Sequence, residues 1–315
     1  MKTFESEKKM ISVIIPVLNE EASLGKLYTG IIRNLPADRD KEIWFIDDGS
    51  TDGSVAVIKE IMKTDCNVHL ISFRKNFGKA MALETGFRNV SGDIIITMDA
   101  DLQDDPAELP RFIEKIEEGF DVVSGWKQKR QDPLEKRLPS RLFNRVISKA
   151  SGIDLHDFNC GFKAYRKEVV DAIDVYGELH RYIPCLATRL GFSITEITVH
   201  HNKREYGKSK YGRERYIRGL LDFLTITFLS RFNDRPMYFF GRCGILLGMI
   251  GFVICIYLVI LKCLGSAIGG RPLLLLGVML LIVSIQLFSI GFIGNMIVDN
   301  SYRRNYNENH IKEKI

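Results

Sequence analysis

The sequence predicts an α/β domain with a mostly parallel sheet, followed by interfacial helices and two transmembrane helices. In the first third of the chain, β-prone apolar segments alternate four times with helical segments, which favours a parallel sheet covered by helices. Acidic residues follow these strands at their carboxyl ends, where open α/β sheets bind ligands. Near the C-terminus, residues 243–261 and 273–298 are uncharged, and each segment is long enough to cross a hydrocarbon core of ~30 Å.

The predicted strands come in a regular order, and polar residues follow each of them. We expect strands at residues 11–17, 42–46, 68–73, 93–98 and 121–124. The first leads into a helix that begins at residues 19–21, and the second into the acidic, glycine-rich loop 47–53. Capping of the next helix accounts for Ser50, Thr51 or Asp52, so we expect at least one of Asp47 and Asp48 to be free for a sugar or a base edge.

The stretch 97–106 is the one around which we expect the domain to be organised. A buried strand runs directly into Asp99 and Asp101, and two like charges one residue apart are unfavourable unless a cation lies between them. Carboxylates are hard ligands suited to Mg²⁺ or Mn²⁺, and Gln103 adds a neutral oxygen. We interpret these three residues as metal ligands, against the alternative of an ordinary strand-to-helix turn. Asp104 and Asp105 are interpreted as caps of the next helix.

Composition and motifs exclude several classes of protein. The chain lacks both G-x-G-x-x-G and G-x-x-x-x-G-K-[ST], so the dinucleotide and P-loop interpretations have no phosphate cradle. The net charge of +5 is modest, and the basic residues gather near the predicted spans without interleaved aromatics. A phosphate substrate or an anionic lipid surface is therefore the expected partner, and nucleic acid is not. The six cysteines have no metal-type spacing and are expected to be reduced.

Charge bias around the spans predicts their orientation. Basic residues precede the first span at Arg213, Arg215, Arg218, Arg231 and Arg235, and follow the second at Arg303, Arg304, Lys312 and Lys314. The connecting loop has only Lys262 and Arg271, so the positive-inside rule predicts that both termini are cytoplasmic. The polar N-terminus predicts no cleavable signal peptide. Within residues 211–236, three arginines precede an apolar run that Asp222 interrupts, which predicts an interfacial helix. Residues 138–146 predict a weaker surface stripe.

Four motifs carry a resemblance to a known family. They are Pro16-Val-Leu-Asn-Glu20, Asp47-Asp-Gly-Ser-Thr-Asp52, Arg74-Lys-Asn-Phe-Gly-Lys79 and Asp99-Ala-Asp-Leu-Gln-Asp-Asp-Pro106. In order and spacing they resemble the signatures of the family 2 inverting glycosyltransferases. Residues 157–165, 180–184 and 204–210 resemble the subgroup that glycosylates a polyprenyl phosphate, which includes dolichol-phosphate mannose synthases and bactoprenol glucosyltransferases. The resemblance covers roughly residues 11–300.

This resemblance implies a GT-A fold, of Rossmann-like nucleotide-sugar type, and a set of site residues. It assigns the nucleotide sugar to Pro16, Leu18, Glu20, Ile46, Asp48, Lys79, Ala100 and Lys127, and catalysis to Asp99, Asp101, Asp157, Arg204 and Lys210. Leu18 stands where Tyr is usual, which weakens base stacking. Lys127 and Lys163 stand where Arg is common. At Lys127, the point charge of an ammonium therefore replaces a guanidinium, which can bind a phosphate through two parallel hydrogen bonds. Asp157 is expected to position the acceptor or a basic neighbour.

The expected domains are a GT-A catalytic domain over residues 1–210, amphipathic juxtamembrane helices over 211–236, the spans over 237–300 and a basic tail over 301–315.

We expect transfer of one sugar, such as glucose from UDP-glucose, to undecaprenyl phosphate on the cytoplasmic leaflet of the inner membrane. No base is required, because a phosphate monoester has a second pKa of about 6; His180, His200 and His201 are read as hydrogen-bonding residues. The resemblance suggests a homo-oligomer.

The sequence leaves three alternatives open. The first is a GDP-mannose enzyme like the dolichol-phosphate mannose synthases. The second is a processive polysaccharide synthase, disfavoured because the chain has no Q-x-x-R-W motif and only two predicted spans. The third is an inactive scaffold or a partner of a lipid flippase, which the intact acidic and basic motifs argue against.

Overall fold

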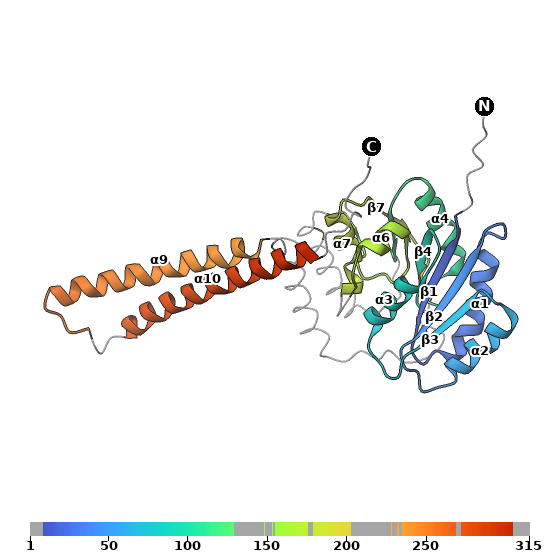
Figure 1. The fold of residues 1–315 in the computed structure, drawn as a ribbon, viewed down its shortest axis with the longest axis horizontal. Coiled ribbons are helices and arrows are strands. Elements are labelled where there is room, and N and C mark those ends of the chain that lie inside the picture. The colour runs from blue at the N-terminus through green and yellow to red at the C-terminus, as the bar shows by residue number, and fades with distance from the viewer. Residues whose placement is uncertain are drawn as a thin grey trace, which may run out of the picture. The chain divides into compact units, whose positions relative to one another are not determined.

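The computed structural model describes residues 9–128, 148, 153, 155–175, 179–202, 228, 232, 235–268 and 272–304. Arg204, Lys210, the stripe at 138–146 and most of the interfacial segment 211–236 lie outside these residues. The chain divides into two compact units, the first made of Met1–Ile226 with Asn309–Ile315 and the second of Thr227–Glu308, which are described separately. Figure 1 shows the fold.

The first unit is built on a seven-stranded sheet with the order β3-β2-β1-β4-β6-β5-β7. Its strands are β1 (Ile11–Val17), β2 (Lys41–Asp47), β3 (Val68–Ser72), β4 (Ile94–Thr97), β5 (Val122–Trp126), β6 (Lys163–Arg166) and β7 (Ile194–Thr198). All pairings are parallel except those of β6, which runs antiparallel to both β4 and β5. The mostly parallel sheet is confirmed. Neither β6 nor β7 was predicted, because the chain beyond residue 157 was interpreted only through its polar motifs.

Helices cover both faces of this sheet (Figure 1). They are α1 (Glu21–Asn34), α2 (Ser54–Thr64), α3 (Lys79–Asn89), α4 (Leu109–Glu117), α6 (Lys167–Ala172) and α7 (Ile183–Arg189), with 3₁₀ turns η1 (Pro106–Glu108) and η2 (Leu179–Arg181). Helices α1, α2 and α4 pack their apolar stripes into one core, with Leu27, Ile58 and Phe112 buried there. Helices α3, α6 and α7 pack into a second core on the opposite face, around Phe87 and Val169.

The sheet brings the polar loops after β1, β2 and β4 to one edge. The three strands are parallel neighbours, and Val17 is in register with Asp47. Hydrogen bonds join the loops after β1 and β2: Thr51 N donates to Asn19 Oδ1 at 2.7 Å, and Asn19 N donates to Ser50 Oγ at 2.9 Å. The polar residues that follow these strands therefore lie at one edge of the sheet, as predicted, and their binding of a ligand there stays a prediction.

The second unit contains two long helices, α9 (Pro236–Cys263) and α10 (Pro272–Arg304). Residues Pro236–Cys263 and Pro272–Val298 are long and apolar enough to cross a membrane, as predicted. Small residues line the contact between the helices: a Cβ at Gly244 would lie 3.1 Å from the ring of Phe288, and Ser284 Oγ donates to the Gly244 carbonyl at 2.8 Å. Such close backbone approach is typical of membrane helix pairs. The predicted reduced state of the six cysteines is also found, since all are free thiols.

Candidate active site

The loop after β4 folds on itself and carries Asp99 and Asp101. Asp99 N donates to Asp104 Oδ2 at 3.2 Å, and Gln103 N donates to Asp101 Oδ1 at 3.2 Å. Leu102, between Asp101 and Gln103, adopts a left-handed backbone conformation with φ of 60°, which is uncommon for a branched apolar residue. The loop thus places the two carboxylates at the end of a buried strand, where the sequence predicted them.

Asp99 is ion-paired with Lys79, the first residue of α3. Burial raises the pKa of the Asp99 carboxyl, but the positive charges of Lys79 and Lys127 outweigh that effect and lower the pKa to about 2. Asp99 is therefore ionised at neutral pH, and Lys79 supplies its counter-ion. The sequence assigned Lys79 to the nucleotide sugar without indicating this pair, since the residues lie on different elements.

Asp104 and Lys127 form a second ion pair, with 2.6 Å between Oδ1 and Nζ. The Asp104 side chain is fully buried and that of Lys127 is 10 % exposed. Burial lowers the pKa of Lys127, yet the charge of Asp104 holds it well above its usual range. The interpretation of Asp104 as a helix cap is wrong; its neighbour Asp105 is the cap, accepting from Ala107 N at 3.0 Å.

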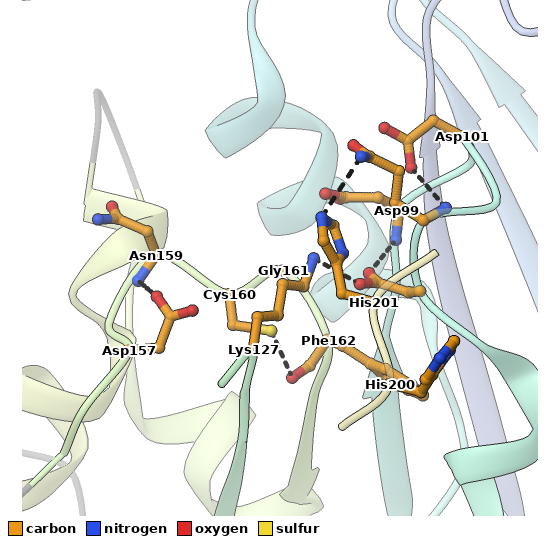
Figure 2. Close-up of polar contacts among 12 residues, drawn as sticks. Asp99, Asp101, Lys127, Asp157, Asn159, Cys160, Gly161, Phe162, His200 and His201 are labelled. Carbon is orange, nitrogen blue, oxygen red and sulfur yellow. Dashed lines mark hydrogen bonds and ion pairs between the residues drawn. The ribbon is translucent and has the colours of Figure 1, made fainter. Parts of the chain in front are cut away.

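His201 lies beside the acidic loop, as Figure 2 shows. His200 contacts the far end of the same loop, with its Nδ1 at 3.9 Å from Asp105 Oδ2. An isolated antiparallel bridge joins His201 to Asp104, and Asn202 N donates to the Gln103 carbonyl at 3.0 Å. This brings His201 Nε2 to 3.4 Å from Gln103 Nε2. The sequence did not predict this neighbour of Gln103, because 98 residues separate the two and no motif links them.

A cavity of about 140 Å³ opens next to Asp99. Its lining residues are Lys79, Leu83, Thr97, Asp99, Asn159, Cys160, Gly161, Lys163, Tyr165, His180 and Arg181. Buried Lys163 anchors the segment before β6 by donating to the carbonyl oxygens of Phe158, at 3.3 Å, and Cys160. Thr97 Oγ1 holds the same segment by donating to the Gly161 carbonyl at 2.8 Å. The cavity thus combines the carboxylate of Asp99 with the basic residues Lys79, Lys163 and Arg181.

His180 contributes a neutral imidazole to this cavity. The pKa of His180 is lowered to about 2, mainly by burial and further by the positive charges of Lys79, Arg181 and Lys163. In the described part of the chain its Nδ1 has no hydrogen-bond partner. A group with so low a pKa is a poor general base at neutral pH.

Asp157 is not brought together with Asp99 and Asp101. It is 2 % exposed, and its Oδ1 accepts from Asn159 N at 3.1 Å. Figure 2 shows it on a separate loop, away from the acidic loop and its two carboxylates. Its assignment to catalysis stays a prediction from the resemblance.

The predicted nucleoside-binding part of the site contains Asp47 and Asp48, whose carboxylates accept hydrogen bonds from nearby residues. Asp48 accepts from Phe77 N at 2.7 Å and from Gly78 N at 3.0 Å, and burial raises its pKa. Asp47 accepts from Ser50 N at 3.0 Å and from Ser72 Oγ at 2.6 Å, so both carboxylates have protein partners. That one of them also binds a sugar or a base edge stays a prediction.

The remaining residues assigned to the nucleotide sugar differ in exposure. Ile46 is 0 % exposed and Ala100 is 4 % exposed, so their side chains belong to the core beneath the site. Pro16, Leu18 and Glu20 are half-buried at the same sheet edge.

Comparison with known proteins gives the family. Residues 12–174 match the family described as glycosyl transferase family 2. The chain belongs to glycosyltransferase family 2. This glycosyltransferase is 35 % identical over 312 residues to a dodecaprenyl-phosphate galacturonate synthase from Rhizobium johnstonii, an alignment that covers 97 % of this chain and 92 % of the relative. It is 34 % identical to an undecaprenyl-phosphate 4-deoxy-4-formamido-L-arabinose transferase from Proteus mirabilis, over 94 % of this chain and 90 % of that one.

Solved structures support the same fold for this glycosyltransferase. Glucosyl-3-phosphoglycerate synthase from Mycobacterium tuberculosis, in complex with Mg²⁺ and UDP, superposes with a TM-score of 0.53 at 22 % identity, covering 68 % of this chain and 79 % of that one. A complex of the same enzyme with Mn²⁺ and UDP gives a TM-score of 0.52 at 22 % identity, covering 71 % and 80 %. The GT-A-like fold implied by the resemblance is confirmed.

The donor set of the glycosyltransferase's acidic loop fits a divalent cation of this kind. In the described residues no three His, Cys, Asp or Glu side chains are grouped to hold a metal on their own. Mg²⁺, however, is commonly held by one or two carboxylates together with substrate phosphates. Asp101 offers carboxylate oxygen, and the amide of Gln103 faces an imidazole nitrogen of His201. Because amide oxygen and nitrogen are assigned from the surrounding hydrogen bonds, Gln103 can equally present its oxygen there.

Gly161 is where the cavity wall approaches Asp99 most closely. A Cβ at this position would lie 2.8 Å from Asp99 Oδ1 and 3.0 Å from Cγ. Gly161→Ala is therefore expected to displace the Asp99 carboxylate from Lys79 and to lower kcat/KM by about 10-fold, equivalent to about 1.4 kcal/mol. Steady-state kinetics in detergent measure this. Gly25→Ala, where an added Cβ meets nothing within 4 Å, is the matched control; equal kinetics for both variants would contradict the assignment.

Proposed function

We propose that this glycosyltransferase transfers a single sugar from a nucleotide sugar to a polyprenyl phosphate. The observation that carries the proposal is the match to the dodecaprenyl-phosphate galacturonate synthase over 97 % of the chain, because it includes the α/β unit and both candidate spans. A long isoprenoid acceptor resides in a bilayer, so an enzyme that uses it needs a membrane anchor next to its catalytic unit. The relative from Proteus mirabilis, named for undecaprenyl phosphate, supports the same class of acceptor.

The donor in this proposal is a UDP-sugar. UDP is bound in the solved complexes that share the fold. Glucose has no support from the relatives, whose names specify galacturonate and 4-deoxy-4-formamido-L-arabinose. The proposal therefore concerns a sugar of that wider class, with GDP-mannose as the alternative donor.

The reaction is a displacement at the anomeric carbon with inversion. An oxygen of the acceptor phosphate forms the new bond to that carbon, while the bond to the diphosphate oxygen breaks and its electron pair stays on the diphosphate. The acceptor is already largely a dianion near neutral pH, so the neutral His180 imidazole has no proton to remove. His180 and Asp99 bind the sugar in the cavity and orient it, and Lys79 keeps Asp99 in place.

The leaving diphosphate is proposed to lie between the acidic loop and two basic residues of the 203–210 segment. A Mg²⁺ or Mn²⁺ ion, held by Asp101, Gln103 and His201, would supply charge neutralisation to the diphosphate. Asp99, which the sequence also predicts as a ligand, is proposed instead to stay paired with Lys79. Arg204 and Lys210 add positive charge, which stabilises the transition state more than the ground state because negative charge builds on the leaving group. Asp157 is proposed to position one of these basic residues or the acceptor.

We further propose that the enzyme resides in the bacterial inner membrane with its catalytic unit cytoplasmic, and that residues 211–236 lie on the membrane surface. The support is the excess of Lys and Arg on both outer flanks of the spans. A reporter fused after Ile315 should then read cytoplasmic, and a tag placed between Gly265 and Gly270 should be accessible from outside the cell. A tail accessible from outside would contradict the two-span topology.

Incubation of membranes with radiolabelled nucleotide sugars and undecaprenyl phosphate tests the reaction. We expect one donor, such as UDP-galacturonate, to give a lipid-linked monosaccharide that mild acid releases. Membranes containing the Asp101→Asn variant are the control for endogenous activity. Polymer would instead indicate a processive synthase, and absence of transfer with UDP- and GDP-sugars alike would indicate an inactive scaffold or flippase partner.

A further inference from the structure

Gln286 is a polar residue in the middle of the candidate span of α10. The span runs from Pro272 to Val298, so Gln286 lies about 18 Å from its nearer end at a rise of 1.5 Å per residue. A glutamine side chain is far too short to reach the headgroup region from that depth. The Gln286 side chain is nevertheless exposed.

The exposure has a geometric cause. Residues on one side of α10 pack against α9, as Gly277, Ser284 and Gly291 do, and Ser284 bonds to the Gly244 carbonyl. Gln286 follows Ser284 by two positions, which turns it by about 200° around the helix, away from α9. Its neighbours on that outer side, Ile282 and Ile293, are 51 % and 57 % exposed.

Within the described part of the chain, the Gln286 amide has no hydrogen-bond partner. The nearby Ser289 does not serve, because its Oγ donates to the Ile285 carbonyl of its own helix at 3.0 Å. An unpaired amide in hydrocarbon is strongly unfavourable, and lipid tails and isoprenoid chains offer neither donors nor acceptors. The partner must therefore be a polar group on another protein segment at the same depth.

We propose that this partner is Gln286 of a second copy, and that two α10 helices pair through the face formed by Ile282, Gln286, Ser289 and Ile293. Copies inserted in the same orientation and related by a two-fold axis along the membrane normal place identical residues at identical depth. A carboxamide has both donors and an acceptor, so two of them satisfy each other. The small Ser289 next to this pair allows the helices to approach closely.

Cysteine cross-linking in native membranes tests the contact. Under mild oxidation, Gln286→Cys should give a disulfide-linked dimer at several times the yield of the wild type, whose six native cysteines set the background. Phe292→Cys is the matched control, because Phe292 is 61 % exposed but lies about 120° away around α10. Equal dimer yields from the two variants would overturn the proposal. Cross-linking of Gln286→Cys only to a different protein would overturn the assignment to a second copy.

A second measurement separates the hydrogen bond from mere proximity. Gln286→Leu should raise the dimer dissociation constant in detergent by a factor of about 3 to 20, the range expected for an interhelical side-chain hydrogen bond. Gln286→Asn keeps the carboxamide and should retain part of that affinity, whereas Phe292→Leu should leave it unchanged. An unchanged dissociation constant for Gln286→Leu would overturn the role of the amide.

Discussion

Asp101→Asn is expected to lower sugar transfer by at least a factor on the order of 10², while the α/β unit stays folded. Asp101 is only 8 % exposed, and its Oδ1 accepts from Gln103 N at 3.2 Å. Asparagine keeps the size of the side chain and an oxygen for that hydrogen bond, so the loop is preserved. It removes the charge that a divalent cation requires of its ligand. Initial rates with saturating donor and acceptor measure the loss, and near-ultraviolet circular dichroism reports the fold.

The control for Asp101→Asn is Asp105→Asn, in the same loop. Asp105 caps the η1 turn through Ala107 N and takes no part in the proposed metal site. It should retain most activity, since asparagine also serves as a helix cap. EDTA should abolish wild-type transfer, and added Mg²⁺ or Mn²⁺ should restore it. Full activity of wild type in EDTA, or of Asp101→Asn, would remove the metal assignment.

Elements with strong local patterns were predicted closely. The apolar run of β1 was predicted at the residues it occupies, Ile11–Val17, because a short run of apolar residues next to a polar helix start defines a buried strand locally. Both long helices were also predicted, since an uncharged segment of this length has few other stable locations. Antiparallel β6 was not, because its partners β4 and β5 are brought to it by the tertiary fold.

The candidate site was predictable where motifs carry it and not where it depends on distant pairs. Asp99, Asp101 and Gln103 follow β4 as expected, and Lys79 and Lys127 were assigned from the resemblance. Their counter-ions, Asp99 and Asp104, could not be derived, because they lie on elements that the sheet order brings together. The local sequence favoured Asp104 as the cap of the next helix. In the fold, however, its carboxylate is buried and pairs with Lys127.

Lys127→Met is expected to lower the free energy of unfolding of the α/β unit by about 3–5 kcal/mol, because it leaves the buried carboxylate of Asp104 without its counter-ion. Met keeps the length and apolar character of the stem, so the loss reports on charge. Trp44 and Trp126, the two tryptophans of the chain, both lie in this unit. Denaturant titration in detergent followed by their fluorescence therefore measures its unfolding separately from the membrane helices.

The double variant Lys127→Met/Asp104→Asn decides whether the pair is structural or serves the donor. Asparagine at 104 removes the buried charge and keeps an oxygen to accept from Asp99 N. If Lys127 acts as a counter-ion, the double variant should recover most of the stability that Lys127→Met loses, since no unpaired charge remains inside the protein. If Lys127 instead binds the donor phosphates, as the resemblance implies, the single variant should lose about 1 kcal/mol or less of stability, in the range of a screened pair, and raise KM for the nucleotide sugar. A buried position with 10 % exposure favours the first outcome, because a phosphate in the site would have to compete with Asp104 at 2.6 Å.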